Sequence, residues 1–224
     1  MQSKDRTPQF WIIGGGRFGK RAAILLRTRH PASEITVIEK DLQTCRGLAK
    51  EAFRIECREG IRYLELNLKN IGTPDWIVPA IPLHVAFEWI RVTLSQDYNL
   101  HSLDISASLQ TVLPNPVTGG RGQLFVSNAD FICPENCSEP DNICTVTGKP
   151  RPRILHEFLA HIYAEEFTSV VICSQQLEAG VGGFQPRSLF EALDTIKSVG
   201  RPVLLSTACR CHGISNLFTI SPKQ

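Results

Sequence analysis

The chain has 224 residues, 42% of them hydrophobic, so it is long enough to bury a substantial core as one α/β domain or as two smaller ones. The chain has 24 Lys and Arg residues against 22 acidic residues. This nearly even balance of charge lacks the electrostatic signature of a nucleic-acid-binding protein or a polybasic membrane anchor. The first ten residues are polar and no later stretch approaches the roughly 20 apolar residues of a membrane span, so we expect no membrane insertion and a soluble, cytoplasmic protein.

The first half of the sequence alternates between apolar runs and stretches of helical periodicity. A strand predicted at residues 10–13 ends in Gly14 and precedes a helix predicted over residues 17–27. A β-branched strand follows at residues 34–38, and Asp41 is suited to cap the next helix. Further strands are predicted at residues 53–57 and 75–78, and helices at residues 61–71 and 83–94. Leu64, Leu66 and Leu68 would also suit a strand, but we favour the helix.

The second half begins after an irregular stretch, residues 95–122, which is rich in proline and glycine and is a candidate domain boundary. Strands are then predicted at residues 123–127, 169–173 and 202–207, and helices at residues 153–165 and 186–199. This alternation predicts an α/β fold with a doubly wound, mostly parallel, Rossmann-like sheet. We favour one sheet of six or seven strands. The competing organisation is a Rossmann half at residues 1–98 and a second α/β half at residues 99–224.

A glycine motif stands between the first strand and the first helix. Gly14, Gly16 and Gly19 form the pattern G-x-G-x-x-G, with Arg17 and Phe18 between the last two glycines. In this pattern the first glycine permits the tight turn, the second lets a pyrophosphate approach the backbone, and the third allows close packing of helix and strand. The free N–H groups of the helix N-terminus favour an anion. The motif therefore predicts a dinucleotide site.

An acidic residue follows at the expected distance. Glu39 lies about 20 residues after Gly19, at the end of the second predicted strand, where a carboxylate accepts hydrogen bonds from the adenosine ribose. Its charge would repel a 2′-phosphate, which favours NAD over NADP. Lys40 would tolerate that phosphate, so NADP remains an alternative cofactor.

The runs GGGRFGKRAA and VIEKD resemble the Rossmann domains of TrkA-like proteins and of siroheme-synthase-like proteins (precorrin-2 dehydrogenases). The resemblance covers residues 10–94 and implies NAD binding, without choosing between sensing and catalysis. The cysteine-bearing second half departs from both families.

Three cysteines lie in a segment with no predicted helix or strand, in the spacing C-x3-C-x6-C: Cys133, Cys137 and Cys144. Three thiolates so close in sequence can converge on one metal centre, which needs a fourth ligand and would order the loop. We expect Cys209 as the fourth ligand, with Cys211 and His212 as alternatives. These residues follow the last predicted strand, at the carboxyl edge that the cysteine segment would also reach.

An iron–sulfur cluster is the favoured centre, with structural zinc as the alternative. Neither the paired C-x2-C knuckles of common zinc sites nor the bacterial ferredoxin spacing is present. A third interpretation is a set of unrelated thiols, or a redox disulfide between Cys133 and Cys137. Cys45 and Cys57 are interpreted as buried free thiols.

Candidates for catalysis are weaker. His84 and Glu88 share a helix face at i,i+4 spacing near the expected nicotinamide position, although a solvated face is the ordinary meaning of such a pair. Cys173 ends a predicted strand at the same edge. The glycine-bearing run at residues 174–189 is predicted to be a strand-to-helix loop suited to an anion.

Together these features predict an NAD-dependent redox protein with a cysteine-ligated centre near the nicotinamide, acting on a small-molecule substrate or a redox partner protein. The alternatives are a TrkA-like nucleotide sensor with structural zinc, and a precorrin-2 dehydrogenase-like enzyme. No nucleic-acid partner is expected. An exposed sheet edge would allow a homodimer.

Overall fold

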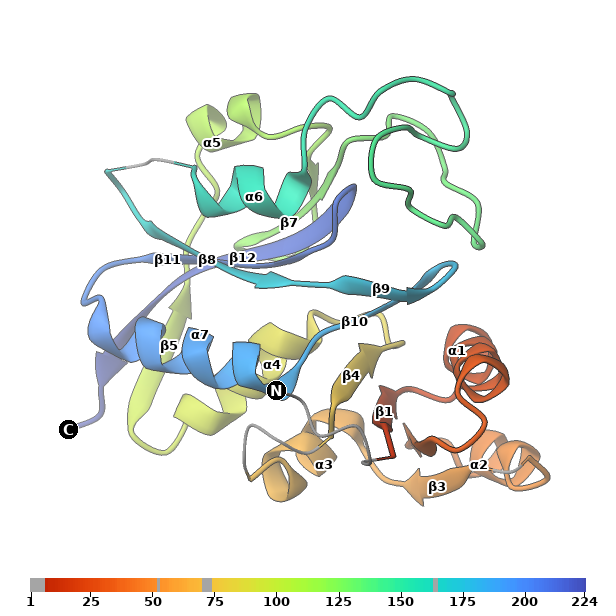
Figure 1. Ribbon diagram of the computed structural model, residues 1–224. Coiled ribbons are helices and arrows are strands. Elements are labelled where there is room, and N and C mark those ends of the chain that lie inside the picture. The colour runs from red at the N-terminus through yellow and green to blue at the C-terminus, as the bar shows by residue number, and fades with distance from the viewer. Residues whose placement is uncertain (1–6, 52, 70–73, 163–164) are drawn as a thin grey trace.

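The computed structural model describes residues 7–51, 53–69, 74–162 and 165–224 (Figure 1). Ile71, expected at the end of a helix, and most of the polar amino-terminal run lie outside the described residues, as do residues 163–164 of the helix predicted over 153–165. Among the helices in the described parts of the chain, none has the length and apolar composition that a membrane crossing requires.

The first sheet is fully parallel, with the strand order β3-β2-β1-β4. Its strands are β1 (Gln9–Ile13), β2 (Glu34–Glu39), β3 (Arg54–Cys57) and β4 (Trp76–Pro79). They alternate with helices α1 (Arg17–Arg29), α2 (Leu42–Leu48), α3 (Gly60–Asn67) and α4 (Val85–Leu94). The predictions for this half are confirmed, including the helix favoured after β3 and the cap: the Asp41 side chain accepts a hydrogen bond from the Thr44 amide.

The second sheet is mixed. Its order is β6-β7-β12-β11-β8, and β5 pairs with the far end of β12. These strands are β5 (Tyr98–Ser102), β6 (Val117–Thr118), β7 (Gln123–Ser127), β8 (Thr168–Cys173), β11 (Val203–Ala208) and β12 (His212–Pro222). β8 and β11 are parallel, whereas β12 is antiparallel to β11, β7 and β5. The helices of this half are α5 (Ala107–Val112), α6 (Leu155–Ala160) and α7 (Pro186–Ser198).

The α/β class with a Rossmann-like parallel sheet is confirmed, but the expectation of one continuous sheet of six or seven strands is wrong. After α4 the chain does not return to the free edge of β4. That edge is occupied by a hairpin of β9 (Gln175–Glu178) and β10 (Val181–Gly183), which bridges to it through Ile77 and Phe184. The run predicted as a loop at residues 174–189 is therefore largely this hairpin, and the second half builds its own sheet.

Three helices form an apolar layer between the two sheets. One core cluster joins buried residues of the first sheet, such as Ile13 and Ile77, to buried residues of the second, such as Val203 and Phe218, through α3, α4 and α7. A second cluster packs α1 and α2 on the other face of the first sheet, and a third packs α5 and α6 on the other face of the second (Figure 1). The two sheets therefore share one buried layer.

His84 ties the two halves together. It is the residue preceding α4, it is 3% exposed, and its ring nitrogens lie 2.7 Å from Asn216 Oδ1 on β12 and 2.9 Å from Thr207 Oγ1 on β11. Burial lowers the pKa of His84 to about 4, against the partly offsetting hydrogen bond with Asn216. At neutral pH the ring is therefore neutral and fully hydrogen-bonded.

We predict that His84 makes folding sensitive to mild acid. Because its pKa is lower in the folded protein than the ordinary value of 6.5, the unfolded chain binds the proton first as pH falls. The stability is complete above pH 6.5, and about 3 kcal/mol is lost as pH falls from 6.5 to 4. Urea unfolding across this pH range should show a smaller loss of stability for His84→Gln than for the unaltered protein. The acidic groups of the variant still titrate, so some loss should remain. Equal pH dependence of the two proteins would contradict the prediction.

Candidate functional site

The glycine turn lies between β1 and α1 and has no space for side chains at two of its three glycines. Gly14 has a φ of +106°, a backbone conformation that favours glycine, and its amide donates to Ile38 O of β2. A Cβ at Gly19 would lie 1.8 Å from Gly14 O. The first turn of α1 is thus packed directly against the turn, as the motif requires.

Gly16 is different, because a Cβ placed there would meet nothing within 4 Å. Gly16 is the N-cap of α1, it makes no side-chain capping bond, and no acidic residue lies in the first helical turn. The helix therefore begins in an exposed stretch of bare backbone with its N–H groups unmatched by a cap, which is the arrangement that binds a phosphate. These observations fit a pyrophosphate at this position.

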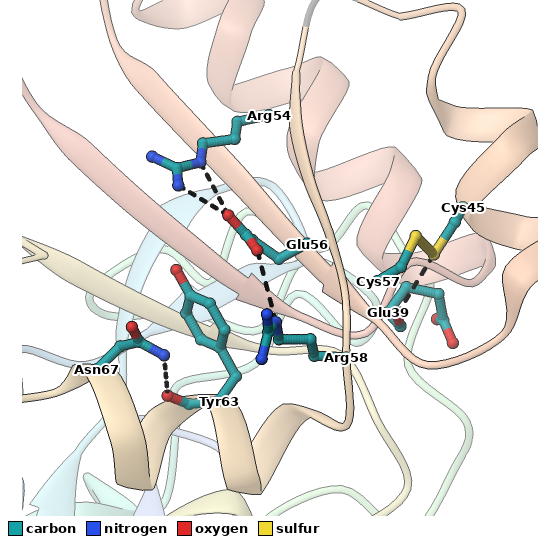
Figure 2. Close-up of polar contacts among 8 residues, drawn as sticks. All are labelled: Glu39, Cys45, Arg54, Glu56, Cys57, Arg58, Tyr63 and Asn67. Atoms are coloured by element: carbon teal, nitrogen blue, oxygen red, sulfur yellow. Dashed lines mark hydrogen bonds and ion pairs between the residues drawn. A yellow bond between two sulfur atoms is a disulfide. The ribbon is translucent and has the colours of Figure 1, made fainter.

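Glu39 is fixed beside the turn by two backbone amides. Its carboxylate accepts from Gly15 N at 2.7 Å and from Asp41 N at 2.8 Å. The adjacent Cys45 and Cys57 are joined in a disulfide, and Cys45 Sγ lies 3.4 Å from Glu39 O (Figure 2). The interpretation of these two cysteines as free thiols is therefore wrong, because α2 places Cys45 against the end of β3. Lys40, next along the chain, is exposed.

Five of the six other cysteines line a cavity of about 570 Å³, and Cys173 is not among them. Although the second sheet is mixed, β7, β8 and β11 run in the same direction, so the residues that follow them meet at one edge. The lining includes Phe18 of α1, Gly180 and Gly182 of the β9–β10 hairpin, and five cysteines with one histidine: Cys133, Cys137, Cys144, Cys209, Cys211 and His212. The structure therefore brings together residues that the sequence analysis expected at one edge.

The cysteine segment, residues 128–153, has no helix or strand and appears as the green loops beyond β7 in Figure 1. It is docked on α1. Arg17 forms an ion pair with Glu135, while Arg21 donates to Glu135 O at 2.8 Å and to Ala179 O at 2.9 Å. Gly180 N donates to Cys137 O at 2.9 Å. The cavity thus lies next to the first turns of the helix that begins at the glycine turn.

The thiols have unequal electrostatic surroundings. Hydrogen bonds from the backbone and hydroxyl of Thr147 lower the pKa of Cys144. Burial raises the pKa of Cys133, and its neighbours Cys137, Cys211 and Cys144 raise it further. Burial and the carboxylate of Glu139 raise the pKa of Cys209 to about 12.

Among the described residues, no three Cys, His, Asp or Glu side chains are arranged to hold a metal ion. The donor set itself suits a soft metal, because thiolates and imidazole are the ligands of zinc and of iron–sulfur clusters. The residues that line the cavity are those predicted as ligands, but their side chains are not close enough together to bind one metal ion.

Comparison with known proteins gives two matches along the chain. Residues 10–108 match the TrkA-N domain, and residues 86–221 match a family described as "Uncharacterized protein, C-terminal domain". A protein of Archaeoglobus fulgidus, described as an uncharacterized protein, is 31% identical over 214 residues, which cover 91% of this chain and 95% of the relative. The chain belongs to the same family as this archaeal protein.

The glycine turn thus lies in a Rossmann-like TrkA-N domain, a type that binds NAD(H), and the cysteines of the cavity lie in the residues that match the C-terminal domain. The TrkA-N part of the resemblance is confirmed, and the match extends beyond residue 94. The siroheme-synthase-like part receives no support from these matches.

The structure does not bring the proposed catalytic residues together. His84 points into the core, whereas Glu88 pairs with Arg91 at 2.7 Å on the helix surface. Cys173 lies at the end of β8 near Glu139, and its pKa is raised by burial. Phe18 is 52% exposed, and the Arg17 guanidinium lies over its ring at 4.8 Å.

Two residues of the cavity carry no sequence signal that singles them out. Glu139 is 8% exposed with a φ of +45°, and its Oε1 has no hydrogen-bond partner. Arg151 donates to Cys211 Sγ at 3.0 Å and to two loop carbonyls. Glu139 and Arg151 reach the cavity only because the cysteine segment folds over the turn between β11 and β12.

The turn geometry predicts unequal effects at two glycines of one motif. Gly19→Ala forces a methyl group against Gly14 O and should lower the free energy of unfolding by about 3 kcal/mol, at the upper end of overpacking costs. Gly16→Ala adds a methyl group to open space and should lower it by about 1 kcal/mol or less, which is the cost of alanine at an N-cap. Denaturant unfolding of both variants measures this difference, and equal costs would contradict the close approach described here.

Proposed function

We propose that this protein is an NAD-binding redox protein in which the dinucleotide occupies the glycine turn and the cysteine-lined cavity holds a thiolate-bound metal centre. The single observation that carries the dinucleotide site is the uncapped, open N-terminus of α1 at Gly16. The TrkA-N match supports the same position. When bound, NAD supplies hydride chemistry.

The chain's own residues account for binding. The backbone amides at the start of α1 would hold the pyrophosphate, and Glu39, fixed by Gly15 and Asp41, would accept hydrogen bonds from the ribose hydroxyls. The charge of Glu39 opposes a 2′-phosphate, which makes NAD the preferred cofactor. Lys40 is exposed beside it and would offset part of that discrimination.

An iron–sulfur cluster is the centre we propose. The cavity of about 570 Å³ has far more room than one small ion needs, since a water molecule occupies about 30 Å³ in the liquid. It lies beside α1, so electrons would travel only a short distance between the two sites. The substrate would be a small molecule or a redox partner protein.

The second candidate is a nucleotide sensor with structural zinc. It is favoured by the contacts that tie Arg17 and Arg21 of α1 to the cysteine segment, because a nucleotide at the helix start would bias that docking. It is also favoured by His84, whose ring is fully used in the core. Anaerobic purification separates the two candidates: a brown protein containing iron and sulfide supports the redox protein, and a colourless protein containing zinc supports the sensor.

Gly16→Leu tests dinucleotide binding. A Cβ at Gly16 meets nothing within 4 Å, so the larger side chain should occupy the open space before α1, block the pyrophosphate and weaken NAD binding more than about 10-fold, or 1.4 kcal/mol, while the protein stays folded. Gly120→Leu is the matched control, since a Cβ at Gly120 also meets nothing within 4 Å. Isothermal titration calorimetry with NAD, NADH and NADP measures all three proteins. No heat with the unaltered protein, or unchanged affinity in Gly16→Leu, would overturn the proposal.

Glu39→Ala tests cofactor choice. Loss of the carboxylate removes a ribose acceptor and a repulsive charge, so the ratio of NAD to NADP affinity should fall about 10-fold or more. Lys40→Ala serves as the control with the opposite charge and should leave or raise that ratio. The same titrations give both ratios. A ratio unaffected by Glu39→Ala would mean that this carboxylate does not contact the ribose.

A further inference from the structure

The disulfide between Cys45 and Cys57 lies next to Glu39, the residue that would hold the adenosine ribose (Figure 2). Cys57 is the last residue of β3 and pairs in register with Glu39, the last residue of β2. Cys45 belongs to α2, and its Sγ lies 3.4 Å from the carbonyl oxygen of Glu39. The disulfide therefore joins the helix that follows Glu39 to the strand that flanks it.

The helix α2 depends on this bond for much of its attachment to the sheet. It has seven residues, of which only Cys45 and Leu48 are buried. Helices as short as this are marginal in water and depend on tertiary contacts. Leu48 packs in the core cluster on the outer face of the first sheet. Opening the disulfide would remove the covalent one of these two attachments.

The start of α2 also holds the carboxylate of Glu39. The side chain of Asp41, the N-cap residue, accepts from Thr44 N at 2.7 Å, and the amide of Asp41 donates to Glu39 Oε1 at 2.8 Å. The other carboxylate oxygen, Oε2, accepts from Gly15 N of the glycine turn at 2.7 Å. A movement of α2 therefore reaches the carboxylate of Glu39 through Asp41, and it reaches the glycine turn through that carboxylate.

The two sulfur-bearing residues differ in their access to solvent. Cys45 is 3% exposed, whereas Cys57 is an exposed residue at the end of its strand. A disulfide is opened by a thiolate that attacks one of its two sulfurs, and the rate depends on access to that sulfur. The attack is therefore directed to Cys57, and Cys45 is the leaving group.

Exchange with a dithiol balances without a further reactant. The attacking thiolate bonds to Cys57 Sγ, the bond between the two cysteines breaks, and Cys45 leaves as a thiolate that takes up a proton. The second thiol of the reagent then displaces Cys57, which also takes up a proton, and the reagent becomes a disulfide. The thiol of Cys45 can donate to Glu39 O, which already lies 3.4 Å away, so the reduced form has a partner for its buried thiol.

We propose that Cys45 and Cys57 form a reversible dithiol–disulfide site, opened by a dithiol at Cys57, that sets the affinity of the dinucleotide site at its adenosine end. The oxidised form holds α2 where Asp41 presents Glu39 to the ribose, and it binds the dinucleotide more tightly. The reduced form frees α2 from β3 and binds the dinucleotide more weakly. This inference rests on the proposed dinucleotide site and does not depend on a metal centre in the cavity.

The test measures dinucleotide affinity in both redox forms of the full-length protein. One sample is reduced with dithiothreitol, which is then removed without oxygen, and thiol alkylation with mass spectrometry establishes the state of Cys45 and Cys57 in each sample. Calorimetry should show NAD binding about 5-fold or more weaker after reduction, which is the lower end of common coupling between sites. The preference for NAD over NADP should fall as well, because Glu39 is the group that opposes a 2′-phosphate.

The double variant Cys45→Ser, Cys57→Ser is the control for the other six cysteines, which it retains. It should bind NAD as weakly as the reduced protein does, and dithiothreitol should not change its affinity. Circular dichroism shows whether the reduced protein and the variant remain folded. A second measurement needs no variant: because coupling is reciprocal, saturating NAD should raise the ratio of reduced to oxidised dithiothreitol at which half of this pair is reduced, by the same factor.

The outcomes separate this inference from the proposed function. If NAD gives no heat with either redox form, the proposed dinucleotide site fails and this inference fails with it. If both forms bind NAD with equal affinity and equal preference over NADP, the inference fails alone. It also fails alone if Cys45 and Cys57 are recovered only as free thiols from the untreated protein, or if NAD does not change the midpoint of their reduction.

Discussion

The apolar layer formed by α3, α4 and α7 is the constraint on which the rest of the structure depends. This layer covers one face of each sheet, so the two sheets share their largest core cluster, while smaller clusters cover their outer faces. It fixes the parallel sheet, which carries the glycine turn, relative to the mixed sheet, which carries the cysteines. His84 adds a polar tie within the same contact, because it joins the start of α4 to β11 and β12. A buried histidine whose two ring nitrogens are both hydrogen-bonded favours one relative position of the two sheets more strongly than apolar contacts alone.

The sequence predicts the parallel sheet well because local signals and tertiary packing agree there. Apolar runs end in turn residues, Asp41 caps the helix that it precedes, and the glycine spacing fits only a strand, a turn and a helix in that order. The mixed sheet is less predictable. β5 contains the polar residues Asn99 and His101. The apolar residues of β12 are interrupted by Ser215 and Asn216, so neither strand shows the continuous apolar run that marks a buried strand.

The site divides in the same way. Gly14, Gly16, Gly19 and Glu39 can be picked out from the sequence because the spacing of the motif assigns each of them an expected backbone or charge role. The cysteines were placed at the correct edge because strands that run in the same direction end at the same edge. The contacts of Cys211 with Arg151 and of Cys209 with Glu139 form only after the cysteine segment has folded over the turn, so no sequence pattern reveals them. A disulfide between Cys45 and Cys57 also depends on a packing of α2 against β3 that the sequence does not display.

The contacts between α1 and the cysteine segment differ in strength, and this bears on how the two sites would communicate. The side chains of Arg17 and Glu135 are 73% and 48% exposed, so their ion pair contributes little and a phosphate at the helix start would compete for Arg17 at small cost. Arg21 instead donates to two backbone carbonyls, one in the segment and one in the β9–β10 hairpin. Those bonds hold the segment in place whether or not Arg17 is released. Nucleotide binding would therefore change the charge near Glu135, while Arg21 keeps the hairpin wall of the cavity in place. Any stronger coupling between the nucleotide site and the cavity has to pass through the backbone of α1.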